Sequence, residues 1–235
     1  MSVTSAPQLP ARFLWSIRPR AVLYTLIGLL LLAILAVATL RPFQVLPRMA
    51  LSPGFALMDQ FGRQVTSEDL RGHLVVYTFT YSRCVAPCPQ TSQVLQALQT
   101  QLPTLQRTGL PIDLVTITFD AAHDTPTQLR GYAATLQADP AHWRFLTSDA
   151  AQLKQVIGAG FDVYYAAKDD GSFEFEPTIV LVDGAGIVRA RYRGAEPPVS
   201  TLVRDLTLVV QEAQNSSGPM RLAYEAAHLF LCYPQ

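Results

Sequence analysis

This chain of 235 residues contains a run of twenty consecutive residues without a charge, 21–40 (AVLYTLIGLLLLAILAVATL). The run divides the chain into unequal parts. A helix of that length spans about 30 Å, the thickness of the hydrocarbon core of a bilayer. A cleaved signal peptide would have a shorter apolar region ending in small residues, whereas this run is followed by Arg41 and Pro42. The run therefore predicts a single uncleaved transmembrane helix. A helix buried in a soluble core is the alternative.

The charges on either side of this run predict its orientation. Three arginines precede it within residues 1–20, and two follow it, Arg41 and Arg48. Because cytoplasmic flanks carry the excess of Lys and Arg, we expect residues 1–20 to form a cytoplasmic tail. The rest of the chain would then lie on the extracytoplasmic side of the cell membrane, where disulfides persist.

Composition divides the remaining chain into three parts. Residues 41–54 hold three prolines and a glycine and are typical of a linker. A globular pattern covers residues 55–213, and residues 214–235 form a C-terminal tail with a short amphipathic helix. Lys and Arg total 18 and Asp and Glu total 18, so the chain lacks the basic excess that nucleic acid binding requires.

Strand and helix patterns alternate through the globular part. Buried-strand patterns, rich in apolar and β-branched residues, cover 73–82, 112–119 and 143–148. Helical spacing covers 91–109, 124–137, 149–161 and 200–213, and a strand, turn and strand cover 178–194. This alternation predicts an α/β domain with a mixed sheet flanked by helices.

Cys84 and Cys88 lie between the first of these strands and the helix that follows it. The N-terminus of a helix favours a thiolate over a thiol, so cysteines there are nucleophiles or soft metal ligands. The pair could close a disulfide or hold one soft ion such as Cu(I). Two buried thiols that pack as small apolar side chains are the alternative. A zinc site is disfavoured, because no second cysteine pair occurs at metal-finger spacing.

Four stretches around this pair resemble, in order, the Sco/SenC family. They are FALMDQFGRQVTSEDLRG (55–72), FTYSRCVAPCPQT (79–91), FDAAHDTPTQLRGYA (119–133) and HWRFLTSD (142–149). The resemblance implies a thioredoxin-like fold behind a single membrane anchor. It also implies that Cys84 and Cys88 bind copper and cycle to a disulfide. The implied cofactor is Cu(I), and the implied partner is the copper-binding subunit of cytochrome oxidase, whose copper site the family helps to assemble.

The chain departs from the family pattern at the third copper ligand. The histidine that the family usually supplies falls at Phe175, or at Glu176 if the register slips by one. Phenylalanine cannot bind a metal, and carboxylate oxygen is a hard ligand for a soft ion. Pro177 instead resembles the cis-proline of thioredoxin, and the aspartate usual between the two cysteines is absent from 85–87. These departures favour thiol–disulfide exchange over copper delivery.

Four histidines could replace the missing ligand. We interpret His73, His123 and His142 as surface or turn residues. His228 and Cys232 share one face of the helix expected in the tail. One hypothesis is that the tail folds back and supplies His228 or Cys232 to the cysteine pair; the alternative is a helix that packs its apolar side chains on the domain or the membrane.

Three functions follow from these observations. The first is a copper-handling assembly factor that binds Cu(I) through both thiolates. The second is a thiol–disulfide oxidoreductase, in which Cys84 attacks a partner disulfide and Cys88 resolves the mixed disulfide. The third is a non-catalytic module that only docks partners. We expect the family role, biogenesis of the cytochrome oxidase copper site, with copper binding and disulfide exchange both open because they need the same thiolates.

Overall fold

In the computed structural model the chain forms two compact units, residues 1–42 and 43–235. The structure describes residues 19–40, 44–85, 88–106, 109–215, 221, 224–225 and 227–228. Helix α1 (Pro19–Leu40) forms the described part of the first unit and covers the whole run 21–40. Its side chains are described at 20–32 and 35, and no helix is long and apolar enough to cross a membrane within what is described. The tail predicted at 1–20 lies almost wholly outside the described residues.

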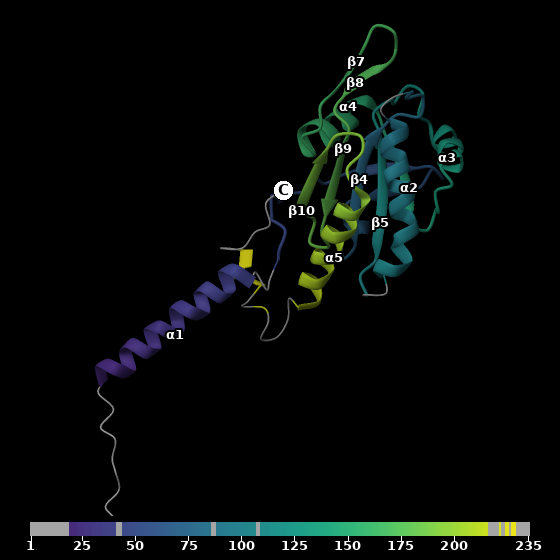
Figure 1. The fold of residues 1–235 in the computed structure, drawn as a ribbon. Helices are drawn as coiled ribbons and strands as arrows, with labels where there is room; N and C mark the ends of the chain where they lie inside the picture. The colour runs from purple at the N-terminus through teal and green to yellow at the C-terminus, as the bar shows by residue number, and fades with distance from the viewer. Residues whose placement is uncertain are drawn as a thin grey trace, which may run out of the picture. The chain divides into compact units, whose positions relative to one another are not determined.

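The second unit is built on one eight-stranded sheet in the order β1-β10-β9-β4-β5-β6-β2-β3, beside a two-stranded hairpin, β7-β8 (Figure 1). The strands are β1 (Ala50–Leu51), β2 (Ala56–Asp59), β3 (Gln64–Thr66), β4 (Leu74–Thr80), β5 (Ile112–Thr118), β6 (Trp143–Thr147), β7 (Tyr165–Ala167), β8 (Phe173–Phe175), β9 (Thr178–Val182) and β10 (Ile187–Arg193). Parallel pairing joins β4 to β5 and β5 to β6, and the other neighbours are antiparallel. The sheet is therefore mixed, as predicted.

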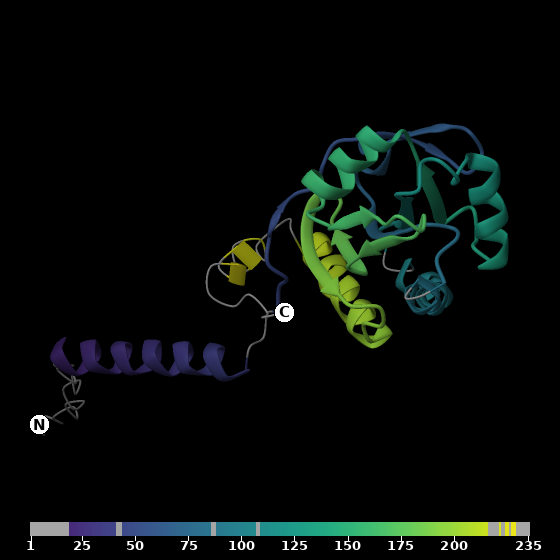
Figure 2. The ribbon, with the colours of Figure 1, turned by 90° about the horizontal axis from the view of Figure 1, so that it is seen from above.

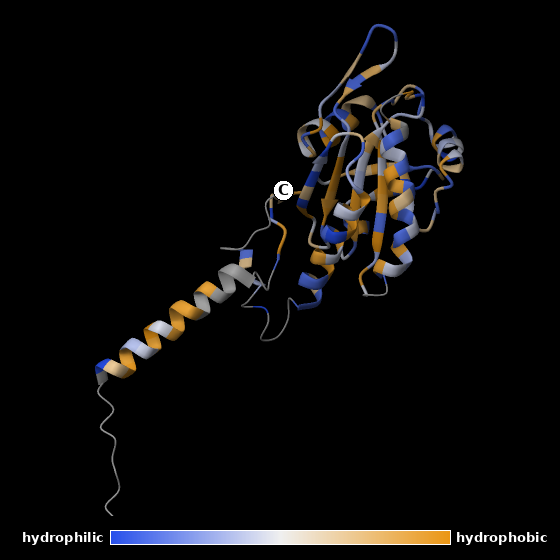
Figure 3. Cartoon of the chain, viewed as in Figure 1, coloured by the Kyte–Doolittle hydropathy of each residue, from blue (hydrophilic) through white to orange (hydrophobic). Residues whose placement is uncertain are grey.

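Helices cover both faces of this sheet (Figure 2). They are η1 (Glu68–Leu70), α2 (Cys88–Leu105), α3 (Pro126–Thr135), α4 (Ala150–Leu153), the π-helical segment η3 (Lys154–Gly160) and α5 (Val199–Asn215). The apolar sides of α2, α3 and α5 pack in one buried cluster, and those of α4 and η3 pack in the other. The central strands are the most hydrophobic part of this unit (Figure 3).

Strand β4 explains why two cores form, because all seven of its residues are buried. Successive side chains of a strand point to opposite faces. Val75 and Tyr77 accordingly join the cluster under η3, whereas Leu74 and Val76 join the cluster under α2 and α5. Each fully buried apolar side chain of this size stabilises the fold by about 1.5–3 kcal/mol relative to exposure. The strand predicted at 73–82 is thus confirmed, and its carboxyl end leads directly to Cys84.

The segment 44–54 differs from the linker expected there. Val45 and Leu46 are completely buried, and β1 pairs with β10. The buried guanidinium of Arg189 donates to the carbonyl oxygens of Leu46 at 2.8 Å and Pro47 at 3.2 Å. A side chain at Gly160 would come within 2.5 Å of Pro53. These contacts make the segment part of the domain, because its backbone carbonyls join the carboxylates of Asp183 and Glu212 in satisfying the buried guanidinium of Arg189.

In the described part of the C-terminal tail, His228 contacts the end of α5. His228 Nε2 is 2.8 Å from Glu212 Oε1, and Ala227 is 2% exposed. Glu212 also accepts from Arg189 at 2.5 Å, and it borders a cavity with Leu74, the first residue of β4. Leu74 begins β4, whereas the cysteines follow the other end of this strand, seven residues of about 3.3 Å each further on. His228 therefore lies at the opposite end of the strand from the cysteines.

Candidate functional site

Cys84 and Cys88 form a disulfide at the junction of β4 and α2. Their sulfurs are 2.11 Å apart and their Cα atoms 5.8 Å apart. Cys84 lies in the loop after β4, where its N–H donates to the carbonyl of Tyr81 at 3.2 Å. Cys88 is the first residue of α2. The predicted order of strand, cysteine loop and helix N-terminus is therefore present, with Cys88 on the helix and Cys84 before it.

The two cysteines differ in their access to solvent. Cys88 is 2% exposed and belongs to the apolar cluster under η3. Cys84 is partly buried against the same cluster, and Val85, the next residue, is 87% exposed. A nucleophile or a partner thiol would therefore meet Cys84 first. The positions 86–87 between the cysteines lie outside the described residues.

A buried carboxylate fixes the residue two positions before Cys84. Asp124 is completely buried, and its carboxylate accepts from the Ser82 backbone N–H at 3.1 Å. The hydroxyls of Ser82 and Thr118 donate to the same carboxylate. Hydrogen bonds to a carboxylate are stronger than those between neutral groups. The loop before Cys84 is therefore tied to the loop after β5.

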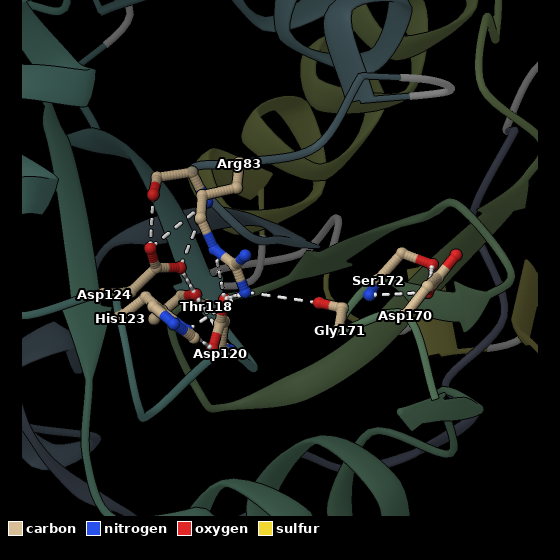
Figure 4. A network of polar contacts seen from close by, with 9 residues as sticks. Arg83, Thr118, Asp120, His123, Asp124, Asp170, Gly171 and Ser172 are labelled. Atoms are coloured by element: carbon tan, nitrogen blue, oxygen red, sulfur yellow. Dashed lines mark hydrogen bonds and ion pairs between the residues drawn. The ribbon is translucent and has the colours of Figure 1, made fainter. Parts of the chain in front are cut away.

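A second carboxylate fixes Arg83, the neighbour of Cys84. Asp120 is 3% exposed and accepts from Arg83 Nε at 3.1 Å and Nη2 at 2.6 Å. His123 Nδ1 is 2.9 Å from the other oxygen of Asp120. Arg83 also donates to the carbonyl of Gly171 at 3.2 Å, which joins the cysteine loop to the turn between β7 and β8 (Figure 4).

These contacts shift two pKa values in opposite directions. Burial would raise the pKa of Asp120, but hydrogen bonds from His123 and Arg83 outweigh it and hold this pKa below its ordinary value of 3.8. The hydrogen bond to Asp120 raises the pKa of Arg83. Both groups are charged at neutral pH, so a fixed ion pair lies directly beside Cys84.

Aromatic rings occupy the place where a third metal ligand was expected. The Phe175 ring centroid is 5.0 Å from that of Phe119 and 6.3 Å from that of Tyr81. Phe173 packs at 5.1 Å from both of these rings. Phe175 and Cys84 pack against the same apolar cluster. The position where the family usually has a histidine is therefore packed among aromatic rings and offers no imidazole.

The two cysteine sulfurs, once reduced to thiolates, are the only part of a copper site that the described residues offer at this position. Sulfur ligands suit Cu(I), and a disulfide-bonded pair lies close enough together for both sulfurs to reach one ion once reduced. No group of three or more His, Cys, Asp or Glu side chains in the described part of the chain is placed to hold a metal. The residues therefore fit Cu(I) as a two-coordinate cargo.

The described histidines bind other polar groups. His73 Nδ1 is 2.6 Å from Asp113 Oδ2, and His142 Nδ1 is 3.3 Å from Gln106 Nε2. The hypothesis that His228 completes the cysteine site is wrong in this structure, because Glu212 holds that imidazole at the far end of β4. Cys232 lies outside the described residues.

Sequence reasoning missed the roles of Asp120, Asp124 and Arg83. The two aspartates were visible as carboxylates that follow the strand 112–119. The carboxyl ends of the parallel strands β4 and β5 meet at one edge of the sheet, so these carboxylates had to lie near the cysteine loop. The specific partners were not predictable, because they depend on how each loop turns.

The model of the SCO1/SenC family matches residues 45–211, well over half of the chain. The chain belongs to the SCO1/SenC family. A relative from Stutzerimonas stutzeri, named for copper binding, is 31% identical over 152 residues, which are 63% of this chain and 72% of the relative. The family assignment made from the four sequence stretches is therefore confirmed.

Solved structures of Sco proteins show the same fold. BsSco, described as a cytochrome c oxidase assembly protein with a disulfide switch, is 22% identical with a TM-score of 0.61, covering 70% of this chain and 96% of BsSco. Bradyrhizobium japonicum ScoI, solved with copper bound, is 26% identical with a TM-score of 0.53, covering 68% of this chain and 99% of ScoI. The predicted thioredoxin-like sheet flanked by helices is confirmed.

The lowered pKa of Asp120 predicts that the Sco domain loses stability in acid. A carboxylate whose pKa is depressed by folding stabilises the fold above its unfolded pKa, and this contribution disappears as the pH falls through the folded value. We expect the free energy of unfolding to fall below pH 3.8, and to fall less steeply in Asp120→Asn. Urea titrations at a series of pH values measure both slopes. Asp169→Asn, an exposed carboxylate, should match the unmodified chain; equal slopes for all three would contradict the prediction.

Proposed function

We propose that this Sco protein exchanges disulfides through Cys84 and Cys88 during assembly of the copper site of cytochrome oxidase. The single observation that carries the proposal is the disulfide at the start of α2, with Cys84 partly exposed and Cys88 buried. The natural substrate is the disulfide form of the cysteines that bind copper in the partner subunit, because these must be reduced before metal enters.

The exchange proceeds in two balanced steps. In the reduced protein the Cys84 thiolate attacks one sulfur of the partner disulfide, forming a mixed disulfide and releasing the other partner sulfur as a thiolate. The Cys88 thiolate then attacks the Cys84 sulfur, which restores the Cys84–Cys88 disulfide and releases the second partner thiolate. The partner disulfide gains two electrons and the protein loses two. Cys88 is the first residue of α2, and the N-terminus of a helix favours a thiolate over a thiol, which suits the second step.

Cu(I) is a second cargo of the same two thiolates in this proposal. Support comes from the soft sulfur donors and from the copper-bound structure of ScoI. The aromatic side chain at Phe175 removes the family's usual third ligand, so we propose that the chain holds Cu(I) less tightly than a member with histidine there. Metal binding and disulfide exchange exclude each other at any moment, because the disulfide has no thiolate to offer.

Trapping tests the order of attack. In a Cys232→Ser background, reduced Cys88→Ser treated with oxidised glutathione should accumulate a stable adduct at Cys84, because no resolving thiolate remains. Reduced Cys84→Ser should form an adduct far more slowly, because Cys88 is 2% exposed. Intact-mass spectrometry measures both. Equal adduct formation at the two cysteines would contradict the assigned roles.

Replacing Phe175 tests the missing ligand. Phe175→His should tighten Cu(I) binding by about tenfold, equivalent to about 1.4 kcal/mol, because it places an imidazole on the side of β8 that packs against the apolar cluster containing Cys88. Glu174→His is the matched control, because neighbouring strand residues point to opposite faces. Competition with a Cu(I) chelator measures the affinities. A result in which both variants bind as the unmodified chain does would show that position 175 does not face the metal.

We also propose that α1 anchors the protein in the cell membrane as a single-pass helix with the Sco domain on the extracytoplasmic side. The support is the uncharged run at 21–40 and a disulfide of the kind that persists outside the cytoplasm. The full chain should stay with membranes during carbonate extraction, and a membrane-impermeant protease should digest the domain from outside the cell. A chain without 21–40 should be released. Release of the full chain as well would refute the anchor.

A further inference from the structure

The β7–β8 hairpin pairs its backbone through alternate residues. The Lys168 N–H donates to the Ser172 carbonyl at 2.8 Å, and the Glu176 N–H donates to the Tyr164 carbonyl at 3.4 Å. Both pairs belong to the register that also sets Glu174 opposite Ala166. Because hydrogen-bonded and non-hydrogen-bonded pairs alternate in an antiparallel ladder, the pairs between these ones exchange no hydrogen bonds.

The same alternation leaves the outer edge of β8 with unused backbone groups. Phe173 and Phe175, opposite Ala167 and Tyr165, direct their N–H and C=O groups away from β7. No third strand pairs with β8 in the part of the chain that the structure describes. The outer side of β7 differs, because Lys154 Nζ donates to the Tyr165 carbonyl at 2.8 Å. The edge of β8 is therefore a template for another strand.

This edge borders a hollow beside the disulfide. A cavity of about 360 Å³ lies between the cysteine loop and the hairpin and is lined by Tyr81, Arg83, Val85 and Phe173 among others. The bond from Arg83 to the carbonyl of Gly171 holds the hairpin tip against the cysteine loop. A chain that occupied the cavity would touch both β8 and the residues on either side of Cys84.

The spacing of the outward N–H and C=O groups of β8 suits an extended polypeptide as the bound partner. Outward N–H and C=O groups at every second residue match the two-residue period of a strand, whereas a helix has no free backbone groups along its length to pair with them. Because exchange with the neighbouring disulfide needs a sulfur on the partner, the bound segment should carry a cysteine. The 87% exposed side chain of Val85 adds apolar surface on the opposite wall, which suits a β-branched or aromatic segment.

We propose that the outer edge of β8 docks an extended, cysteine-containing segment of the partner as a third strand of the hairpin, which presents the partner's sulfur to Cys84. This proposal rests on the disulfide exchange proposed above and names how that exchange selects its substrate. In the direction used for the test, the segment's thiolate attacks the Cys84 sulfur. The Cys84–Cys88 bond breaks, a mixed disulfide forms at Cys84, and Cys88 leaves as a thiolate.

Phe173→Pro and Phe173→Ala test the proposal as a matched pair. Both lose the ring, but only proline loses the outward N–H, and proline at an edge position keeps the hairpin ladder. The oxidised full chain with Cys232→Ser is mixed with a synthetic peptide in which one cysteine is flanked by β-branched residues, and mixed disulfide is followed by mass. One lost hydrogen bond predicts a rate about tenfold lower for Phe173→Pro than for Phe173→Ala.

Dithiothreitol and the oligomeric state separate the outcomes. Dithiothreitol forms no strand, so it should open the disulfide equally fast in both variants. Equal rates of the two variants with the peptide would overturn the docking proposal while leaving the exchange intact. A dimer of the unmodified chain that Phe173→Pro dissociates would also overturn it, because a second copy would then occupy the edge. Failure of dithiothreitol to open the disulfide would refute the exchange itself and the docking with it.

Discussion

Two buried carboxylates determine the geometry on which the proposed chemistry depends. Asp124 holds Ser82, and Asp120 holds Arg83, so both residues before Cys84 are tied to the loop after β5. The apolar cores of the domain place β4 and β5 side by side, but packing alone does not orient a loop. Charged hydrogen bonds made by groups with almost no exposure do so, because breaking one leaves a charge buried without a partner. The position of Cys84 follows from that cost.

The packed aromatic rings of Tyr81, Phe119, Phe173 and Phe175 bear on which chemistry the cysteine pair favours. A domain with the Sco fold and a cysteine pair can hold Cu(I), exchange disulfides, or do both with the same thiolates. Phe175, at the position where the family usually has a histidine, packs on Phe119 and offers no metal ligand. We propose that the pair therefore holds Cu(I) less tightly while keeping what thiol exchange requires, which is one accessible sulfur and one buried sulfur.

Elements with a strong local signal were predictable from sequence. Strand β4 and helix α5 agree with their patterns because burial on both faces, or on one stripe, leaves a periodic trace in the residues. The segment 44–54 was not predictable, because prolines are typical of a linker while its burial depends on Arg189, more than a hundred residues away. The helix expected at 149–161 appears as α4 followed by the π-helical η3, a change of pitch that periodicity does not distinguish. At the site, the cysteines were visible from their spacing, whereas the carboxylates that hold their loop act through contacts between distant loops.

The proposed function requires that Cys84 and Cys88 form a reversible redox pair in the folded Sco domain. The most direct measurement equilibrates the full chain, with Cys232→Ser, in buffers of graded reduced and oxidised glutathione and counts alkylated cysteines by mass while far-ultraviolet circular dichroism monitors folding. We expect one two-electron transition, identical from the reduced and oxidised sides, with the fold intact throughout and Cys84 alkylated before Cys88. A disulfide that opens only when the domain unfolds, or that does not reform on reoxidation, would contradict it.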